Sequence, residues 1–304
     1  MMDILMFSSV KVKLSEDKKF IVAISQKGNK IERSIENTRA IILMGASRFS
    51  DEFLSQIERR GLFLILVNGN ISLIINEHNL PSLSTFLECE KNFIKKRNDI
   101  AFEITNAYLN NATKSIYQSF KIAIEKPDIS EIREPEKLFQ IIKEFEEKTY
   151  FPTISKRLGI QNPEKYIIPV RKIFIYRTLA YLLINRLWPS YSIITPKEYK
   201  IPLAYDISLE LLPIACDELT FKLLETNKRK LPPRQVVIDF MMRHLATEFF
   251  HKSLDKHMHL SEIQEYQISL LKDTFLKGPV KYEAFISVSY THLRAHETSL
   301  HLVC

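Results

Sequence analysis

The sequence predicts an α+β protein in which a small β-rich N-terminal domain precedes a larger all-helical C-terminal domain. Up to residue 75, short apolar or alternating runs are separated by turn residues, whereas from residue 85 onward apolar residues recur at helical spacing. Only 6 of the 304 residues are glycine and 26% are charged, which favours helices over a glycine-rich barrel or sandwich. With 45% hydrophobic residues, the chain can bury a full core.

The β-rich domain is expected to span residues 1–80. Its helix is predicted at residues 50–58, an amphipathic segment that begins with the capping residues Ser50 and Asp51. Asn68-Gly69 between the last two apolar runs is a strong hairpin signal. The strands are predicted over residues 10–14, 19–24, 39–44, 62–67 and 71–75.

The helical domain is expected to span residues 81–287, after a linker over residues 76–84 that contains a proline. Residues 121–135 form a charged connection between the first two helices. The helices are predicted over residues 93–120, 136–156, 163–188, 206–225, 233–258 and 260–277. No membrane span is expected, because the longest apolar region is interrupted by four arginine and lysine residues.

Charge and cysteine content predict the kind of partner and the cellular compartment of the protein. The formal net charge of +7 fits a polyanionic partner. The three cysteines form no paired framework and no metal-binding spacing, and Asp3 stands where a secretory signal would be basic. A reduced, cytoplasmic location is therefore expected.

The tail over residues 288–304 is expected to be an artefact. Residues 288–298 can be back-translated into a string that resembles a transposase-type sequencing adapter read in one frame. The three histidines and the cysteine of this tail therefore carry no information about metal binding. A genuine histidine-rich tail is the alternative.

Residues 189–217 carry the most specific motif of the chain. They read Pro-Ser-Tyr-Ser-Ile-Ile-Thr195, then a polar turn, then a helical segment that contains Asp206. This stretch resembles the CRISPR-associated adaptation endonuclease–integrase family, whose pattern is a Gly-Phe-Leu-His turn followed by a helix opening Asp-Leu-x-Glu. Thr195 stands at the histidine position, eleven residues before Asp206, which is the family's spacing. The family's Glu-containing helix motif ends in Tyr and an aromatic residue, which Thr149-Tyr150-Phe151 matches, and the resemblance covers nearly all of residues 1–287.

The resemblance implies a divalent metal site that is degenerate in this chain. In the family, a glutamate, a histidine, an aspartate and a further acid hold Mg²⁺ or Mn²⁺. The four corresponding positions here are Lys143, Thr195, Asp206 and Leu209, so only the aspartate is retained. Hard divalent ions need several oxygen ligands, and a lysine ammonium repels them. We expect these four side chains in one cleft that does not hold the ion.

Two other acids offer a relocated ligand set, in which Mg²⁺ or Mn²⁺ would still be the cofactor. Glu210 could reach the space left by Leu209, and Glu144 could contribute if its helix were rotated or contained a π-bulge. The alternative interpretation makes Asp206 a helix N-cap and places Glu210 on a solvated helix face.

Basic residues near this motif and beyond it are candidates for contact with the DNA backbone. Nothing in the sequence is suited to reading base edges, so binding is expected to depend on shape and charge. Solubility and charge compensation at helix ends are the alternative role of each residue. The candidates are Lys156, Arg157, Arg171, Lys172, Arg177, Lys228, Arg229, Lys230 and Arg234.

Three functions remain open from the sequence. The first is a catalytically impaired adaptation protein that binds DNA and acts as a scaffold or regulatory subunit. The second is an active metal-dependent endonuclease–integrase with relocated ligands, and the third is a module that binds only proteins. The resemblance further implies a homodimer formed through the β-rich domain, with the small adaptation subunit or an active paralogue as additional partners.

Overall fold

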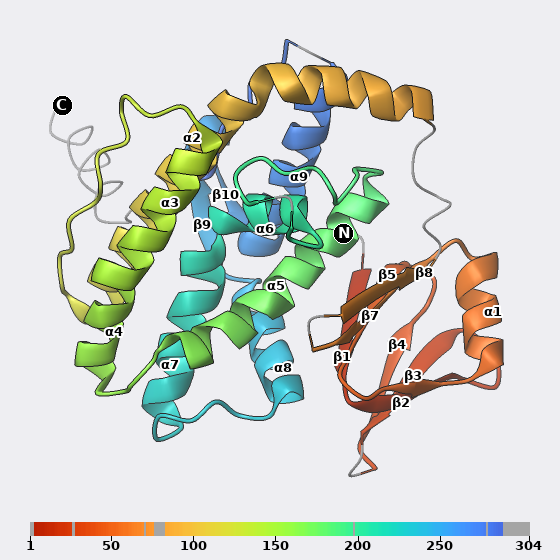
Figure 1. Cartoon of the computed structure of the whole chain (residues 1–304). Helices are drawn as coiled ribbons and strands as arrows, with labels where there is room; N and C mark the ends of the chain where they lie inside the picture. The colour runs from red at the N-terminus through yellow and green to blue at the C-terminus, as the bar shows by residue number, and fades with distance from the viewer. Residues whose placement is uncertain are drawn as a thin grey trace, which may run out of the picture.

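The computed structural model describes residues 3–25, 28–69, 71–75, 83–196, 198–277 and 279–287, with the backbone alone for residues 71, 72 and 83–88. A β-rich N-terminal part lies beside a larger, mainly helical part (Figure 1). The predicted fold class is therefore confirmed. The artefactual tail expected at residues 288–304 and most of the linker expected at residues 76–84 lie outside the described residues.

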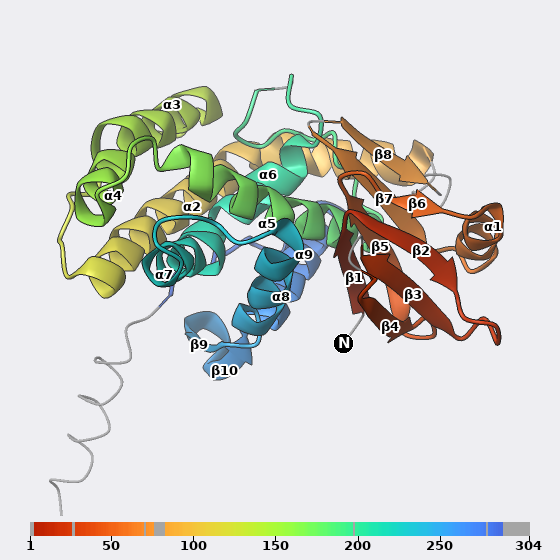
Figure 2. The same cartoon turned by 90° about the horizontal axis from the view of Figure 1, so that it is seen from below.

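The N-terminal part contains two four-stranded sheets that pack against one helix, α1 (Asp51–Arg59) (Figure 2). In the first sheet the first three strands are parallel and the last is antiparallel. The first sheet has the order β1 (Asp3–Ser8), β5 (Thr38–Met44), β7 (Phe63–Asn68), β8 (Ile71–Ile75). The second has the order β4 (Lys30–Ser34), β3 (Phe20–Ser25), β2 (Val10–Leu14), β6 (Arg48–Phe49).

The first sheet joins the two parts of the protein because both of its faces are buried. Ile41 and Leu43 of β5 pack into a small core with α1 and the second sheet. Ala40 and Ile42 alternate with them and belong to the larger core that includes the helices. A strand buried on both faces reads as a continuous apolar run, and residues 40–44 form such a run.

The C-terminal part places one long buried helix, α5, at its centre. α5 packs against α6, α9 and the first sheet. Two π-helical turns, η2 (Glu146–Tyr150) and η3 (Pro213–Asp217), interrupt the helical succession. The α-helices are α2 (Leu83–Phe120), α3 (Pro135–Phe145), α4 (Phe151–Leu158), α5 (Glu164–Ile184), α6 (Pro202–Leu209), α7 (Glu218–Thr226), α8 (Arg234–His244) and α9 (Leu260–Leu276).

The C-terminal part is not all-helical, which corrects one expectation. Residues 248–259 form a hairpin of β9 (Glu248–His251) and β10 (Lys256–His259), where a continuous helix was expected. Aromatic residues such as Phe249 favour a strand, and Asp255 adopts the left-handed conformation in the turn. The helix expected over residues 206–225 also begins earlier and is interrupted, because Pro213 has no N–H to donate.

An extended segment, residues 280–287, completes the helical core. Tyr282 and Phe285 are 2% exposed, although the segment has no regular secondary structure. Asn111 of α2 holds it through hydrogen bonds to the carbonyl of Phe285 and from the N–H of Ser287. Cys89 and Cys216 are buried free thiols. Among the described residues, no helix combines the length and apolar character needed to span a bilayer.

Candidate functional site

Asp206 lies inside α6 and is fully buried. One of its oxygens accepts hydrogen bonds from the N–H groups of Ile193 and Ile194 at 2.7 and 3.1 Å, and the other accepts from the N–H of Thr195 at 3.0 Å. Burial raises the pKa of Asp206 to about 6, against the opposing effect of the three N–H groups. The interpretation of Asp206 as a helix N-cap is wrong. Its carboxylate accepts hydrogen bonds from the preceding turn, residues 193–195, and the N-cap of α6 is Ile201.

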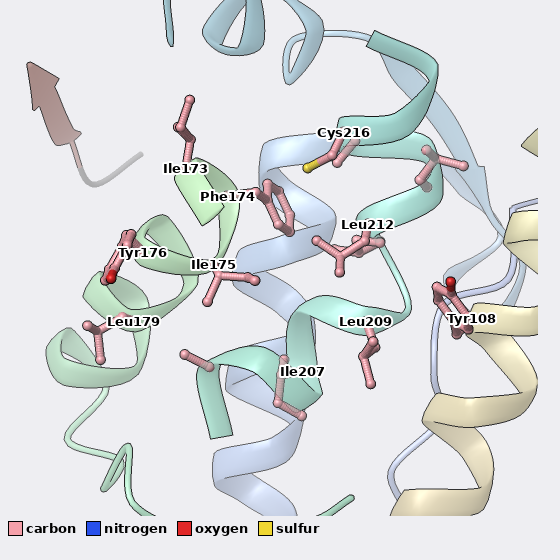
Figure 3. Close-up of a cluster of buried hydrophobic side chains, with 14 of the residues drawn as sticks. Tyr108, Ile173, Phe174, Ile175, Tyr176, Leu179, Ile207, Leu209, Leu212 and Cys216 are labelled. Carbon is pink, nitrogen blue, oxygen red and sulfur yellow. The ribbon is translucent and has the colours of Figure 1, made fainter. Parts of the chain in front are cut away.

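The other three motif positions do not complete a cleft around Asp206. Thr195 is 1% exposed and meets Asp206 through its backbone N–H. Leu209 is fully buried in the apolar cluster that also contains Leu212 (Figure 3). Lys143 is exposed on α3, with its ammonium 4.7 Å from the ring centre of Phe139. The motif thus brings Thr195 and Asp206 together, but in the protein interior.

Glu210, the first candidate for a relocated ligand, is also fully buried. Tyr282 Oη donates to one of its oxygens at 2.8 Å and the N–H of Phe285 donates to the other at 2.7 Å. Burial raises the pKa of Glu210 to about 8. The expectation that Glu210 lies on a solvated helix face is therefore wrong. Its side chain instead holds the extended segment of residues 280–287 against the helices.

This buried carboxyl predicts a pH dependence of stability. The pKa of Glu210 is about 8 in the folded state against 4.5 in the unfolded chain, so its contribution is fully present below pH 4.5 and is lost as the pH rises through 8. We expect the free energy of unfolding to fall by roughly 1.4 kcal/mol or less per pH unit over this window. Glu210→Gln should remove that part of the slope in urea titrations at a series of pH values. If the unfolding free energies of the wild type and Glu210→Gln depended equally on pH, the raised pKa of Glu210 would be contradicted.

Glu144, the second candidate, is engaged at the surface. Its carboxylate forms an ion pair with Lys148 at 2.8 Å and accepts a hydrogen bond from Gln140 at 3.1 Å. The hydrogen bond from Lys148 is the main reason that the pKa of Glu144 is lowered. The helix does contain a π-helical turn, but it begins at Glu146, and Glu146 is the acid that faces the interior.

Sequence reasoning missed a buried ion cluster made of Glu146, Arg171 and Asp217. Arg171 donates from Nε and Nη2 to the two oxygens of Asp217 at 2.9 and 2.6 Å, and from Nη1 to Glu146 Oε1 at 2.5 Å. Tyr108 donates to Glu146 at 2.5 Å and Tyr150 donates to Asp217 at 2.8 Å. The sequence carried no signal for this cluster, because Arg171 lies 25 and 46 residues from its two acids.

The ion cluster borders a cavity of about 560 Å³ between α5, α6 and η2. Glu146 and Arg171 belong to its wall, whereas Asp206 and Thr195 do not. Tyr205, the neighbour of Asp206, does line it. The remaining wall is mostly apolar and aromatic, with charged residues from α5 and the following loop: Phe151, Ile168, Lys172, Ile175, Tyr176, Glu198, Tyr199, Lys200 and Ile201.

Two of the basic residues expected to contact DNA are interior. Arg171 is 5% exposed and all of its nitrogens donate to the ion cluster. Arg177 is 3% exposed and donates to Gln264 and to Tyr181 Oη, while burial lowers its pKa. The expectation of phosphate contact is wrong for both, because their donors are enclosed by protein. Lys172 lies at the cavity described above.

The other basic candidates gather at one end of the helical part, apart from Arg234 at the start of α8. Arg229 donates to the carbonyl of Gly159 at 3.0 Å, which joins the loop after α7 to the end of α4. Arg157 lies over the ring of Phe120 at 6.0 Å. We call this surface the basic end; its residues are Lys156, Arg157, Lys228, Arg229 and Lys230.

The fold is that of Cas1-type integrases. A CAS1 protein from Thermotoga maritima aligns with a TM-score of 0.69 and 16% identity over 90% of this chain and 97% of that one. A casposase bound to its integration product aligns with a TM-score of 0.70 and 12% identity over 99% and 100% of the two chains. A chain of a Cas6-RT-Cas1–Cas2 complex aligns with a TM-score of 0.63 and 10% identity over 94% of this chain and 36% of that one.

At these identities the likeness confirms the fold implied by the motif at residues 189–217. Neither protein-family models nor curated protein sequences gave a match to the chain.

Proposed function

We propose that this protein is a DNA-binding member of the CRISPR adaptation integrases that neither cuts nor joins DNA, and that it acts as a scaffold or regulatory subunit. One observation carries the proposal. The only retained metal ligand of the motif, Asp206, is sealed in the interior with both of its oxygens bonded to backbone N–H groups.

The divalent ion of the resembling family does not fit the residues present here. Such ions take several oxygen ligands at about 2.0–2.6 Å, but Leu209 is apolar and Lys143 carries a positive charge. In the part of the chain that the structure describes, no group of three or more histidine, cysteine or acidic side chains is arranged to hold a metal. Phosphodiester transfer of this type needs a cation to offset charge on the attacking and leaving oxygens.

The basic end supports contact with the DNA backbone. Its residues come from the end of α4 and from the loop after α7, so they form one surface although they are far apart in the sequence. Lys228 and Lys230 are exposed, and no ion pair with an acid of the described chain is seen for them. Lysine and arginine on such a surface displace the counterions of DNA.

We expect binding to duplex or branched DNA with an affinity that falls steeply with salt. The double variant Lys228→Gln/Lys230→Gln should weaken binding and reduce the slope of log K against log salt by about 2, one unit for each lost phosphate contact. Fluorescence anisotropy over a salt series measures both quantities.

The matched control is Lys11→Gln/Lys13→Gln, which removes the same charge from exposed positions of β2 in the other part of the protein. It should bind with nearly the wild-type slope. If both double variants change the slope equally, the basic end is not the DNA surface. If the wild type binds no DNA at all, the protein-only alternative replaces the proposal.

The solved relatives also suggest assemblies. One is a casposase bound to an integration product and another is part of a Cas6-RT-Cas1–Cas2 complex. For the present chain, which we place in the cytoplasm, we propose a homodimer through the β-rich part, together with the small adaptation subunit or an active paralogue. Light scattering of the purified protein, alone and with the candidate subunit, tests each assembly.

A further inference from the structure

We infer that Arg171 is a built-in cation that occupies a latent divalent-metal site formed by Glu146 and Asp217. The inference rests on the proposed function, since it names a residue that would exclude a divalent ion from the space beside η2. It concerns a carboxylate pair that is distinct from the four motif positions Lys143, Thr195, Asp206 and Leu209.

The guanidinium of Arg171 bridges the two acids in the manner of a bound ion. Three of its nitrogens contact three carboxylate oxygens, at 2.9 and 2.6 Å for Asp217 and at 2.5 Å for Glu146. The acids come from the two π-helical turns, η2 and η3, and the arginine comes from α5 between them. The guanidinium of Arg171 thus connects η2, η3 and α5, which are distant from one another in the sequence.

The two carboxylates are oriented by groups other than the arginine. Tyr108 of α2 donates to Glu146, and Tyr150 donates to Asp217. Both tyrosines are fully buried, so these donors are fixed by packing. Removal of the guanidinium therefore leaves two prearranged carboxylates, and one or two carboxylates completed by water are a common site for Mg²⁺ or Mn²⁺.

The charge balance explains why an ion is excluded while Arg171 is present. Burial disfavours the charge on Arg171, yet Asp217 and Glu146 hold its pKa well above the usual value. It therefore stays charged throughout the pH range of a folded protein. A divalent ion would have to displace a bidentate guanidinium and would leave that charge buried without a partner, which is strongly unfavourable.

The neighbouring cavity provides a route for an ion once the arginine is gone. Arg171 and Glu146 form part of the wall of the 560 Å³ cavity, with Asp217 fully buried behind them. Shortening Arg171 to alanine extends this cavity toward Asp217. The space vacated is polar, because it is bounded by two carboxylates and two tyrosine hydroxyls, and it can hold an ion with its waters.

The test compares thermal unfolding and Mn²⁺ binding, the latter followed by the electron paramagnetic resonance of the free ion, in wild type and Arg171→Ala. We expect neither Mn²⁺ nor a chelator to change the melting temperature of the wild type. The variant should melt at a lower temperature in chelator and should bind Mn²⁺. Its melting temperature should then recover as binding stabilises the folded state, by roughly 3–5 °C for each tenfold excess of Mn²⁺ over the dissociation constant in a domain of about 150–250 residues. The double variant Arg171→Ala/Asp217→Asn should lose this response.

Arg177→Ala is the matched control. Arg177 is a buried arginine on the same helix, but it contacts Gln264 and Tyr181 and no carboxylate. Its alanine variant should be destabilised without any response to Mn²⁺. A response of the same size in Arg177→Ala would show general ion binding and overturn the inference.

The latent site can also be tested if Arg171→Ala does not fold. In that case refolding from denaturant is followed by near-ultraviolet circular dichroism, and native signal that returns with Mn²⁺ but not with chelator supports the latent site. No recovery in either condition overturns it, as does Asp217-dependent binding of Mn²⁺ by the wild type. Metal-dependent cleavage of DNA by the wild type would instead overturn the proposed function, whatever the variants do.

Discussion

Replacing Arg171 by leucine is expected to lower the free energy of unfolding by about 3–5 kcal/mol. The change removes the single cation shared by Glu146 and Asp217, and Asp217 has no exposed surface through which water could solvate its charge. One or both acids must then take up a proton or remain charged without a partner. Either outcome costs more than the salt bridge itself contributes.

A double replacement separates this charge effect from lost packing. Arg171→Leu/Asp217→Leu removes the buried acid together with its cation, and ion clusters replaced by apolar groups are often as stable as the original. We therefore expect the double variant to unfold at a higher urea concentration than Arg171→Leu alone. A double variant that is less stable by the sum of the two single losses would contradict the electrostatic explanation.

Asp206→Ala is expected to cost about 3 kcal/mol or more of unfolding free energy. Three backbone N–H groups, those of Ile193, Ile194 and Thr195, would lose their acceptor in the protein interior, at about 1–3 kcal/mol for each group left unsatisfied. A residue whose role was to bind a metal would behave differently. Removal of such a ligand would change how the stability responds to added metal, and the metal-free protein would be nearly as stable as before.

Asp206→Asn is the matched variant for this prediction. It keeps one carbonyl oxygen as an acceptor in the same volume, so the loss should be clearly smaller than for alanine. Chemical denaturation in chelator measures the stability of the three proteins, which should fall from the wild type to Asp206→Asn to Asp206→Ala. Equal stability of Asp206→Ala and the wild type would contradict the structural role.

The motif spacing could be read from the sequence because it is a requirement of folding. Asp206 bonds to the backbone of the turn that ends at Thr195, eleven residues earlier, and this contact does not depend on a metal. Most elements of the β-rich part were equally predictable, since their apolar runs and the Asn68-Gly69 turn are local signals. The strands β1, β4 and β6 were not predicted.

What the sequence could not reveal depends on contacts between distant segments. The burial of Glu210 follows from its contacts with Tyr282 and Phe285, which lie 72 and 75 residues away. The interior positions of Arg171 and Arg177 follow from acids and amides on other elements. Periodicity on a single helix cannot tell a basic residue that faces DNA from one that meets a buried partner.

An assay of strand products tests most directly whether the protein binds DNA without cutting or joining it. Purified protein is incubated with linear and branched DNA in Mg²⁺, in Mn²⁺ and in chelator, and the strands are separated under denaturing conditions. We expect retarded complexes on a native gel in all three conditions and no shortened or joined strands. Strand products that require a divalent ion and are lost in the folded Asp206→Asn variant would contradict it.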